Sequence, residues 1–436
     1  MKGPALYKEA LRIIPGGTQL YSKRSELYLP EFWPAYYSKA KGVEVIDLDD
    51  NKYIDMSVFA MGACVLGYAD RDVDRAVIRA INNGVTSTLN CPEEVKLAQL
   101  LCELHSWANM VKFSRSGGEA VSIAIRIARA HTRKAKIAFC GYHGWCDWYL
   151  AANLGNKRAL DGQLMPGLMP AGVPRSLKDT AFGFNYGRVD ELETIINKHG
   201  DELAAVILEP ARDEPDTDFL KEVKKMTSSA KAVLIFDEIT SGFRMNAGGI
   251  HLLLGVNPDV AVFAKAMANG YPIGAVIGKK KVMQAAQSNF LSSTNWSERT
   301  GFAAAIATID KFQDKDVAKH LIRVGGKIQQ GWRKAAEKAD LKIKISGIAP
   351  LSHFSFDYPE ALMLSTYFTQ EMLKKGFLAW TQFKASYAHK DRHIQKYIKA
   401  VNEVFNKLKK LMQKNQLKKN IEGPTARTGF YRLVQN

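Results

Sequence analysis

Apolar and polar positions follow a regular pattern along the middle of the chain, from about residue 110 to residue 278. Short apolar runs rich in β-branched residues are separated by longer stretches in which apolar positions have helical spacing. Runs without polar alternation are typical of strands buried on both faces, so the pattern predicts a mostly parallel sheet covered by helices. Ligands of such sheets bind at the carboxyl ends of the strands. The predicted strands are 110–113, 136–140, 204–208, 232–236, 260–264 and 273–277.

The two ends of the chain have a different pattern. Residues 43–55 predict a hairpin whose turn is centred on Asp49, Asp50 and Asn51. After Ser297 a long helical pattern leads to predicted strands at 353–356 and 377–380 and predicted helices at 359–375 and 389–413. No Pro/Gly/Ser linker cuts the chain into independent modules. We therefore expect one large α/β domain and a smaller α/β domain formed by the N- and C-terminal segments.

The composition is that of an ordinary globular protein. With 436 residues, 46% hydrophobic and 24% charged, the chain can bury a sizeable core, which excludes a disordered chain and a small disulfide-stapled fold. The five cysteines include no C-x-x-C pair, so we expect neither a disulfide framework nor a zinc site, and a reducing cytoplasm fits best. Charged residues interrupt the N-terminus, and no run approaches the ~18 apolar residues of a spanning helix, so neither a signal peptide nor a membrane span is expected.

The net charge of +17 is the one unusual feature of the composition. It is compatible with nucleic acid, an anionic membrane surface or phosphorylated substrates as partners. Many lysines of the C-terminal third alternate with apolar residues at helical spacing, which indicates solvated helix faces and a polar tail. No basic stripe is interleaved with aromatic residues, so a nucleic-acid partner is not expected.

A small-residue turn follows the first predicted strand of the sheet. Ser116, Gly117 and Gly118 lead from this strand directly into a helical pattern. Free N–H groups at a helix start, together with the positive end of the helix dipole, form a seat for a phosphate. A glycine pair before a helix is also common as a tight connection alone.

An aromatic residue and a histidine follow the second predicted strand, in the segment Gly141-Tyr142-His143-Gly144. The flat ring of Tyr142 could stack on a planar cofactor, although core aromatics also close strand ends. Considered alone, His143 is best interpreted as a buried, hydrogen-bonded histidine. No second histidine lies at metal-ligand spacing, so no metal site is expected.

Two charged residues close later apolar strands. Asp237 and Glu238 end one of them, and a carboxylate at that place requires a partner such as a metal, an arginine or a protonated ring nitrogen. Lys265 closes the next strand. A desolvated amine has a lowered pKa suited to imine formation, whereas a lysine whose amine extends to the surface has no such role.

The order of these features matches the requirements of pyridoxal 5′-phosphate (PLP). Its phosphate needs a helix terminus, its ring a stacking partner and its aldehyde a lysine. Its pyridine nitrogen needs a carboxylate, so that the ring can accept electrons from a bond broken at the α-carbon of the substrate. One cofactor thus accounts for the glycine turn, the tyrosine, Asp237 and Lys265.

The chain resembles the class III (subgroup II) aminotransferases of PLP fold type I, and among them the branch of glutamate-1-semialdehyde 2,1-aminomutase. The resemblance runs from residues 14–17 through 142–144, 236–238 and 269–272 to 386–389. It implies that Lys265 is the Schiff-base lysine, that Asp237 pairs with the pyridinium nitrogen and that Tyr142 stacks on the ring. The other cofactor-binding residues expected near PLP are Ser116, Gly117, Gly118, His143 and Glu209.

The resemblance also implies a homodimer with shared active sites. Members of the family close each site with a threonine of the neighbouring subunit, and Thr294 in the segment 292–296 matches it. A helix cap for the long helix expected to begin near Ser297 is the alternative role of Thr294. The expected domains are 1–60, an N-terminal segment of the small domain and the active-site entrance, 61–310, the large PLP-binding domain, and 311–436, the C-terminal small domain.

Departures from the aminomutase pattern bear on the substrate. Gly118 stands where relatives usually have Ser or Thr. Lys23, with Arg24 beside it, stands where the aminomutase has, after Pro-Gly-Gly, an arginine that binds the substrate carboxylate. The chain is more similar here to relatives associated with amino-sugar or surface-polysaccharide biosynthesis. We expect an aminotransferase that moves an amino group from an amino-acid donor to an aldehyde or ketone, on a sugar-like or phosphorylated acceptor. Glutamate-1-semialdehyde aminomutase activity and a non-catalytic binding or scaffold protein are the alternatives.

Overall fold

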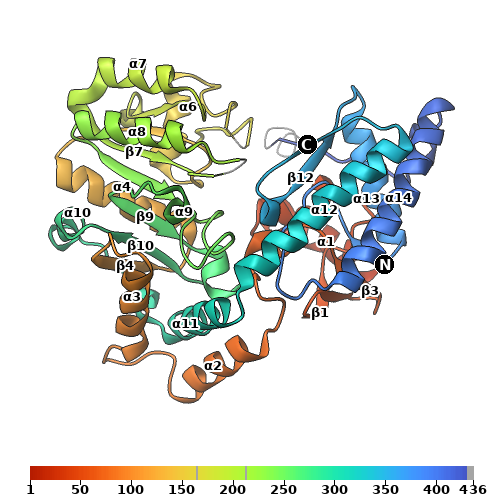
Figure 1. The fold of residues 1–436 in the computed structure, drawn as a ribbon, viewed down its shortest axis with the longest axis horizontal. Helices are drawn as coiled ribbons and strands as arrows, with labels where there is room; N and C mark the ends of the chain where they lie inside the picture. Colours follow the sequence, from red (N-terminus) through yellow and green to blue (C-terminus); the bar gives the residue numbers. More distant parts are fainter. Residues whose placement is uncertain (164, 212–213, 430–436) are drawn as a thin grey trace. The chain divides into compact units, whose positions relative to one another are not determined.

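The computed structural model describes residues 1–163, 165–211 and 214–429 (Figure 1). The chain forms two compact units. One unit consists of Met1–Asp70 and Lys319–Asn436, and the other of Arg71–Ala318. Both boundaries lie after the positions expected from the sequence, residues 60 and 310. We describe each unit by itself and call Arg71–Ala318 the large unit and the other the terminal unit.

A seven-stranded sheet forms the centre of the large unit, with the order β4-β10-β9-β8-β7-β5-β6. Strands β6, β5, β7, β8 and β9 pair in parallel with one another, and β10 runs antiparallel to both of its neighbours, β9 and β4. The predicted mostly parallel sheet is therefore confirmed. The strands are β4 (Met110–Ser114), β5 (Lys136–Cys140), β6 (Ala181–Gly183), β7 (Leu203–Leu208), β8 (Val233–Asp237), β9 (Val260–Phe263) and β10 (Gly274–Gly278).

The length of the connections explains the direction of the strands. Residues 115–135 and 209–232 contain the helices α4 (Gly117–Thr132) and α8 (Thr217–Ser229), which carry the chain back for parallel pairing. Residues 264–273 are too few for such a crossover, which takes roughly a dozen residues or more. Strand β10 therefore returns antiparallel to β9. The short strand β6 was not predicted, because it lacks an apolar run.

Each face of this sheet is covered by helices. In β7 the side chains of Ala205 and Ile207 pack in the cluster that includes α4, whereas those of Val206 and Leu208 pack in the cluster that includes α8 (Figure 1). Helix α7 (Val189–His199) contributes Leu192 to the second cluster. Because successive side chains of a strand point to opposite faces, apolar residues at every position are required for burial on both. The remaining helices of this unit include α2 (Arg71–Asn82), α3 (Pro92–Leu104) and α11 (Arg299–Asp314).

The terminal unit contains a four-stranded sheet of order β1-β2-β3-β13 and the two-stranded sheet β11-β12. The predicted hairpin is confirmed, because Val45 pairs with Tyr53 and the carboxylate of Asp47 accepts the N–H groups of Asp49 and Asn51 in the turn. The strands are β1 (Tyr37–Lys41), β2 (Glu44–Asp47), β3 (Lys52–Asp55), β11 (Ile343–Ser346), β12 (His353–Phe356) and β13 (Phe377–Leu378). The helices include α1 (Lys2–Ile13), most of α12 (Val317–Ala339), α13 (Ala361–Lys374) and α14 (Asp391–Gln413).

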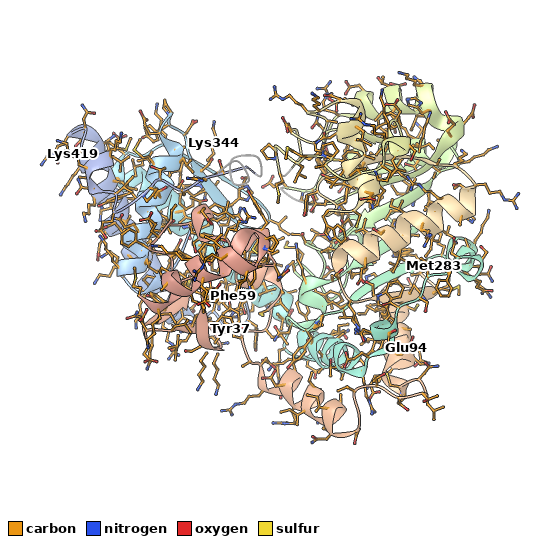
Figure 2. The ribbon with its side chains drawn as sticks, turned by 180° about the vertical axis from the view of Figure 1, so that it is seen from behind. Tyr37, Phe59, Glu94, Met283, Lys344 and Lys419 are labelled. Carbon is orange, nitrogen blue, oxygen red and sulfur yellow. The ribbon has the colours of Figure 1, made fainter. Side chains whose placement is uncertain are left out.

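The lysines of this unit lie on its outside, in agreement with the sequence interpretation. Helix α14 buries Tyr397, Val401 and Leu408, while Lys396 and Lys399 are exposed. Figure 2 shows Lys344 and Lys419 at the periphery of the same unit. No helix within the described ranges is long and apolar enough to cross a membrane.

Candidate active site

The start of α4 provides backbone donors at the end of β4. Ser116 is the N-cap residue: its Oγ accepts from Glu119 N at 3.3 Å, and Glu119 Oε2 accepts from Ser116 N at 2.9 Å. This capping box uses the Ser116 hydroxyl. The N–H groups of Gly117 and Gly118 have no acceptor in the part of the chain that the structure describes. Together with the helix dipole they form a seat for an anion.

The two glycines let neighbouring segments approach this seat closely. A Cβ on Gly117 would lie 2.9 Å from Ile239 Cδ1, in the segment after β8. A Cβ on Gly118 would lie 3.2 Å from Trp145 Nε1, in the segment after β5. A side chain at 118 would therefore meet the indole of Trp145, and the exposed ring would have to shift slightly to make room for it.

The side chains of Gln163 and Glu209 hold the backbone of the segment after β5 in place. Gly141 has a positive φ of 108°, its N–H donates to Gln163 Oε1 at 2.6 Å, and a Cβ there would lie 2.6 Å from Glu209 Oε2. The N–H of Tyr142 donates to the same Glu209 oxygen at 3.1 Å. Glu209, which we expected beside the cofactor, is buried and holds the backbone of this segment. Only glycine combines this backbone conformation with the close approach of the carboxylate.

The ring of Tyr142 is held at the edge of the core. It meets the ring of Tyr149 edge-on at 6.1 Å, and the Tyr149 hydroxyl donates to Gly141 O at 2.9 Å. Burial, with smaller effects of the nearby Cys146, Glu209 and Asp237, raises the pKa of Tyr142. The phenol is therefore neutral at physiological pH.

Asp237 and His143 form a buried pair at the ends of β8 and β5. His143 Nδ1 lies 2.8 Å from Asp237 Oδ2, and Asp237 Oδ1 accepts from Ile239 N at 3.1 Å. Asp237 is 4% exposed and His143 2%. His143 Nε2 faces Cys140 O at 3.1 Å, so both ring nitrogens of His143 are used within the protein.

Lys265 follows β9 in an unusual backbone conformation. Its φ is 42°, in the left-handed region, and it is followed by the fully buried Ala266 and Met267. A non-glycine residue in this region is strained and is kept there by its packed surroundings. Its Nζ donates to Thr240 Oγ1 at 2.8 Å. Because Thr240 lies three residues after Asp237, one short segment carries both the Asp237 carboxylate and the hydroxyl that contacts the Lys265 amine.

Thr294 lies at the start of the short 3₁₀ helix η9 (Thr294–Ser297) and is exposed. Helix α11 begins at Arg299, and the N-cap is Glu298, whose Oε1 accepts from Thr300 N at 2.7 Å. The alternative role of Thr294 as the cap of this helix is therefore wrong. The Arg115 guanidinium donates to the backbone oxygens of Asn295, Trp296 and Glu298, which ties this segment to the start of α4.

The two residues considered for substrate binding belong to the terminal unit. Lys23 is exposed. The guanidinium of Arg24 lies 5.5 Å from the centre of the Tyr21 ring, and a Cβ on Gly16, with its φ of 72°, would lie 1.8 Å from Arg24 Nη2. Arg24, unlike Lys23, is thus held in place by its neighbours.

Sequence reasoning missed several residues that shape the site in the large unit. Thr240 meets the amine of Lys265, Gln163 joins the expected Glu209 in holding the segment after β5, and Glu119 completes the capping box. The only available signal was positional: Thr240 follows the acidic strand end, and Glu119 stands three residues after the N-cap residue, as capping boxes require.

The geometry fits PLP as a ligand. The unused N–H groups of Gly117 and Gly118 suit its phosphate, the buried carboxylate of Asp237 suits its ring nitrogen, and the amine of Lys265 suits its aldehyde. No group of three or more His, Cys, Asp or Glu among the described residues could hold a metal ion. The fold and this set of groups define a PLP-dependent transferase of fold type I.

Comparison with known proteins places the chain within this class. The model of the class III aminotransferases matches residues 30–405, and the chain belongs to this family. It is 31% identical to 3-aminobutyryl-CoA aminotransferase of Cloacimonas acidaminovorans, covering 94% of this chain and 97% of that protein. It is 32% identical to glutamate-1-semialdehyde 2,1-aminomutase of Syntrophobacter fumaroxidans (93% and 98%) and 30% identical to 2'-deamino-2'-hydroxyneamine transaminase of Streptomyces kanamyceticus (74% and 79%).

Solved structures agree with the family. The PLP internal aldimine form of the FumI protein of Sphingopyxis sp. has a TM-score of 0.85 at 25% identity, covering 94% of this chain and 97% of that chain. An omega-transaminase of Sphaerobacter thermophilus has a TM-score of 0.82 at 25% identity (93% and 97%). The predicted fold type I, the PLP cofactor and the class III aminotransferase family are confirmed. The protein is an enzyme, and the alternative of a non-catalytic scaffold is wrong.

Proposed function

We propose that this aminotransferase moves an amino group from an amino-acid donor to an aldehyde or ketone that carries an anionic group such as a phosphate. Sugar-like acceptors of surface-polysaccharide biosynthesis belong to this class. The observation that carries the proposal of an amino transfer at this site is the pair of contacts after β8, Asp237 to His143 and Thr240 to Lys265, beside two unused N–H donors of α4.

PLP, when bound, supplies an electron sink for the bond broken at the α-carbon and a carbon that accepts the amino group. Gly117 and Gly118 would hold its phosphate through their N–H groups, and Tyr142 would cover its ring. Asp237, held by His143, would keep a proton on the ring nitrogen. Lys265 Nζ would attach the cofactor and then take and return the proton of the substrate carbon.

Three observations support an anionic acceptor, and a fourth supports a sugar-like acceptor. The chain has a net charge of +17. One relative is named for an acyl-CoA substrate, and coenzyme A carries phosphates. Another is named for the amino-sugar compound 2'-deamino-2'-hydroxyneamine, which supports a sugar-like acceptor. Arg24, held by Tyr21 and Gly16, is a charged side chain of the terminal unit suited to bind an anion.

Glutamate-1-semialdehyde 2,1-aminomutase activity is the second candidate. It is favoured by relatives of that name at 29–32% identity, which cover almost the whole chain. Incubation of the purified protein with the semialdehyde, without an added amino donor, tests it. Formation of 5-aminolevulinate would support this candidate over the first.

We also propose a homodimer in which Thr294 completes the site of the partner subunit. The large unit exposes large apolar side chains, among them Phe290 (90%), Leu89 (80%) and Trp145 (72%). Exposed apolar surface of this kind favours coverage by another protein surface. Trp145 touches the phosphate seat at Gly118, and Thr294 is exposed as well, so a second copy that covers this region would lie close to the seat.

Substrate comparison tests the acceptor. A panel of amino donors is combined with matched acceptors that differ only in a phosphate or coenzyme A group, and kcat/KM is measured for each. We expect a higher kcat/KM for the anionic member of each pair, and equal values would contradict the proposal. Borohydride reduction and peptide mapping identify the lysine that binds PLP, and a label on a lysine other than Lys265 would contradict its assignment.

A further inference from the structure

The hydroxyl of Thr240 contacts the amine of Lys265. Lys265 Nζ donates to Thr240 Oγ1 at 2.8 Å, and both residues are partly buried. The lysine is attached to the end of β9 and the threonine to the segment after β8, so the contact joins two neighbouring strands of the sheet.

The backbone around Thr240 is fixed from both sides. Before it, Asp237 Oδ1 accepts from Ile239 N, and the buried Glu238 accepts from His251 Nδ1 and from the Ser241 hydroxyl. At Thr240 itself, the carbonyl oxygen accepts from Arg244 Nε at 3.2 Å. The hydroxyl is therefore presented from a rigid support, as a group that positions another side chain must be.

The amine of Lys265 needs such a support. Lysine has a long side chain with several rotatable bonds, and immobilising it costs conformational entropy. In the proposed reaction this amine would have to stay close to the substrate carbon whose proton it takes and returns. A misplacement of about 1 Å in such a group can cost about 100-fold in rate.

A hydroxyl suits an amine that changes its protonation state. It accepts a hydrogen bond from the ammonium form and can donate one to the lone pair of the neutral form. The contact can therefore persist while a proton arrives at Nζ and leaves it, and Thr240 keeps its own proton throughout. Valine has nearly the same shape and can form neither bond.

We propose that Thr240 is a positioning residue of the transamination reaction, whose hydroxyl holds the Lys265 amine in both of its protonation states. The proposal rests on the assignment of Lys265 under the proposed function. It adds that the hydroxyl three residues after Asp237 sets the place from which the amine attaches the cofactor and moves the proton.

The test compares Thr240→Val, Thr240→Ser and wild type. In the PLP-free protein, rapid mixing with PLP separates initial binding, which depends on the phosphate seat, from covalent attachment to Lys265, which is followed by absorbance. We expect Thr240→Val to slow attachment and to lower kcat, each by about 10-fold or more, with the initial binding constant and KM within about twofold. Thr240→Ser keeps the hydroxyl and should remain within about threefold of wild type in both rates.

Thr308→Val is the matched control. Thr308 lies in α11 of the same unit, is fully buried, and its Oγ1 has no hydrogen-bond partner among the described residues. It undergoes the same chemical change at a residue that is not among the site residues and should leave attachment and turnover unchanged. If Thr240→Val proves unstable by thermal unfolding, Thr240→Ala and Thr240→Ser, which differ by one hydroxyl, replace it in the comparison.

Two results would overturn the proposal. The first is a Thr240→Val protein that attaches PLP and turns over at wild-type rates. The second is a Thr240→Ser protein that is as slow as Thr240→Val, or as slow as Thr240→Ala where that variant replaces Thr240→Val. Peptide mapping of the attachment site distinguishes a failure of the proposed function from a failure of the positioning role of Thr240. Attachment at a lysine other than Lys265 contradicts the proposed function, whereas attachment at Lys265 without an effect of the Thr240 hydroxyl contradicts the positioning role alone.

Discussion

His143 Nδ1 lies 2.8 Å from Asp237 Oδ2, while His143 Nε2 lies 3.1 Å from the backbone oxygen of Cys140. The two partners are a carboxylate and a backbone carbonyl oxygen, so both ring nitrogens of His143 are engaged within the protein. His143 contacts Asp237 in a site that is almost closed to solvent and holds the carboxylate in one orientation. This orientation suits pairing of the carboxylate with a protonated ring nitrogen.

Asp237→Asn should lower turnover far more than cofactor content. With an amide at this position, the pyridine nitrogen of PLP is expected to be largely unprotonated. The transition state places more charge on the ring than the ground state does, so the substitution should destabilise the transition state more than it weakens PLP binding. We expect kcat to fall by about 100-fold or more and PLP content, measured by absorbance, to stay above half. In the control Asp216→Asn, at the N-cap of α8, turnover should be unchanged. Near-normal turnover of Asp237→Asn would contradict the role.

Gly117→Ala and Gly118→Ala should differ although the two residues are adjacent. The added methyl at 117 meets Ile239, which packs against the core and whose N–H binds Asp237, whereas at 118 it meets the exposed ring of Trp145, which can shift. We expect the PLP dissociation constant to rise about 10-fold for Gly117→Ala and by less than about threefold for Gly118→Ala. Titration of the PLP-free proteins measures both, and equal losses would show that the packing around the seat does not decide affinity.

Thr294→Val should weaken cofactor retention by about 1.5–3 kcal/mol if its hydroxyl binds a phosphate. Mixed dimers show whether Thr294 contacts the PLP phosphate of its own subunit or that of the partner subunit. When Lys265→Ala subunits are combined with Thr294→Val subunits, at a PLP concentration where the latter are inactive, shared sites place both defects in one site and leave the other intact. Activity should then reappear. Its absence, after native mass spectrometry has shown subunit exchange, would mean that Thr294 serves its own chain or no site.

The free energy of unfolding should fall at mildly acidic pH because of His105. Burial lowers the pKa of this histidine from 6.5 to about 4. In the unfolded chain His105 binds a proton below about pH 6.5, whereas in the folded chain it does so only below about pH 4. The neutral histidine therefore contributes its full stabilisation above about pH 6.5, and this contribution is lost as the pH falls from about 6.5 to about 4. This group accounts for up to ~3 kcal/mol.

Urea unfolding at several pH values measures the effect of His105. His105→Phe removes the titration and should give a shallower loss of stability between about pH 6.5 and about pH 4. It also removes the acceptor of Gly249 N, so this variant should be less stable at neutral pH by about 1–3 kcal/mol. An unchanged pH slope would contradict the contribution of His105. His389 of the terminal unit, whose pKa burial also lowers to about 4, accounts for part of the slope that remains.

Much of the fold could be predicted from local sequence, because a buried strand and an amphipathic helix have different periods of apolar residues. The runs that became β5, β7, β8 and β9 were recognised with ends within one residue of those in the structure. The antiparallel direction of β10 was not predicted, because a run that is apolar at every position has the same pattern in either direction. The order of the seven strands is a tertiary property as well, since pairing depends on residues far apart in the chain.

The sequence by itself determined which chemical groups stand at the strand ends: a glycine pair before a helix, a tyrosine, a carboxylate and a lysine. It did so because each is a local consequence of where an apolar run stops. Only the tertiary structure decided which groups meet. Asp237 and His143 are 94 residues apart, and Lys265 and Thr240 are 25 apart. These contacts depend on which strands lie side by side and on how tightly the turns between them pack, and no single segment encodes either property.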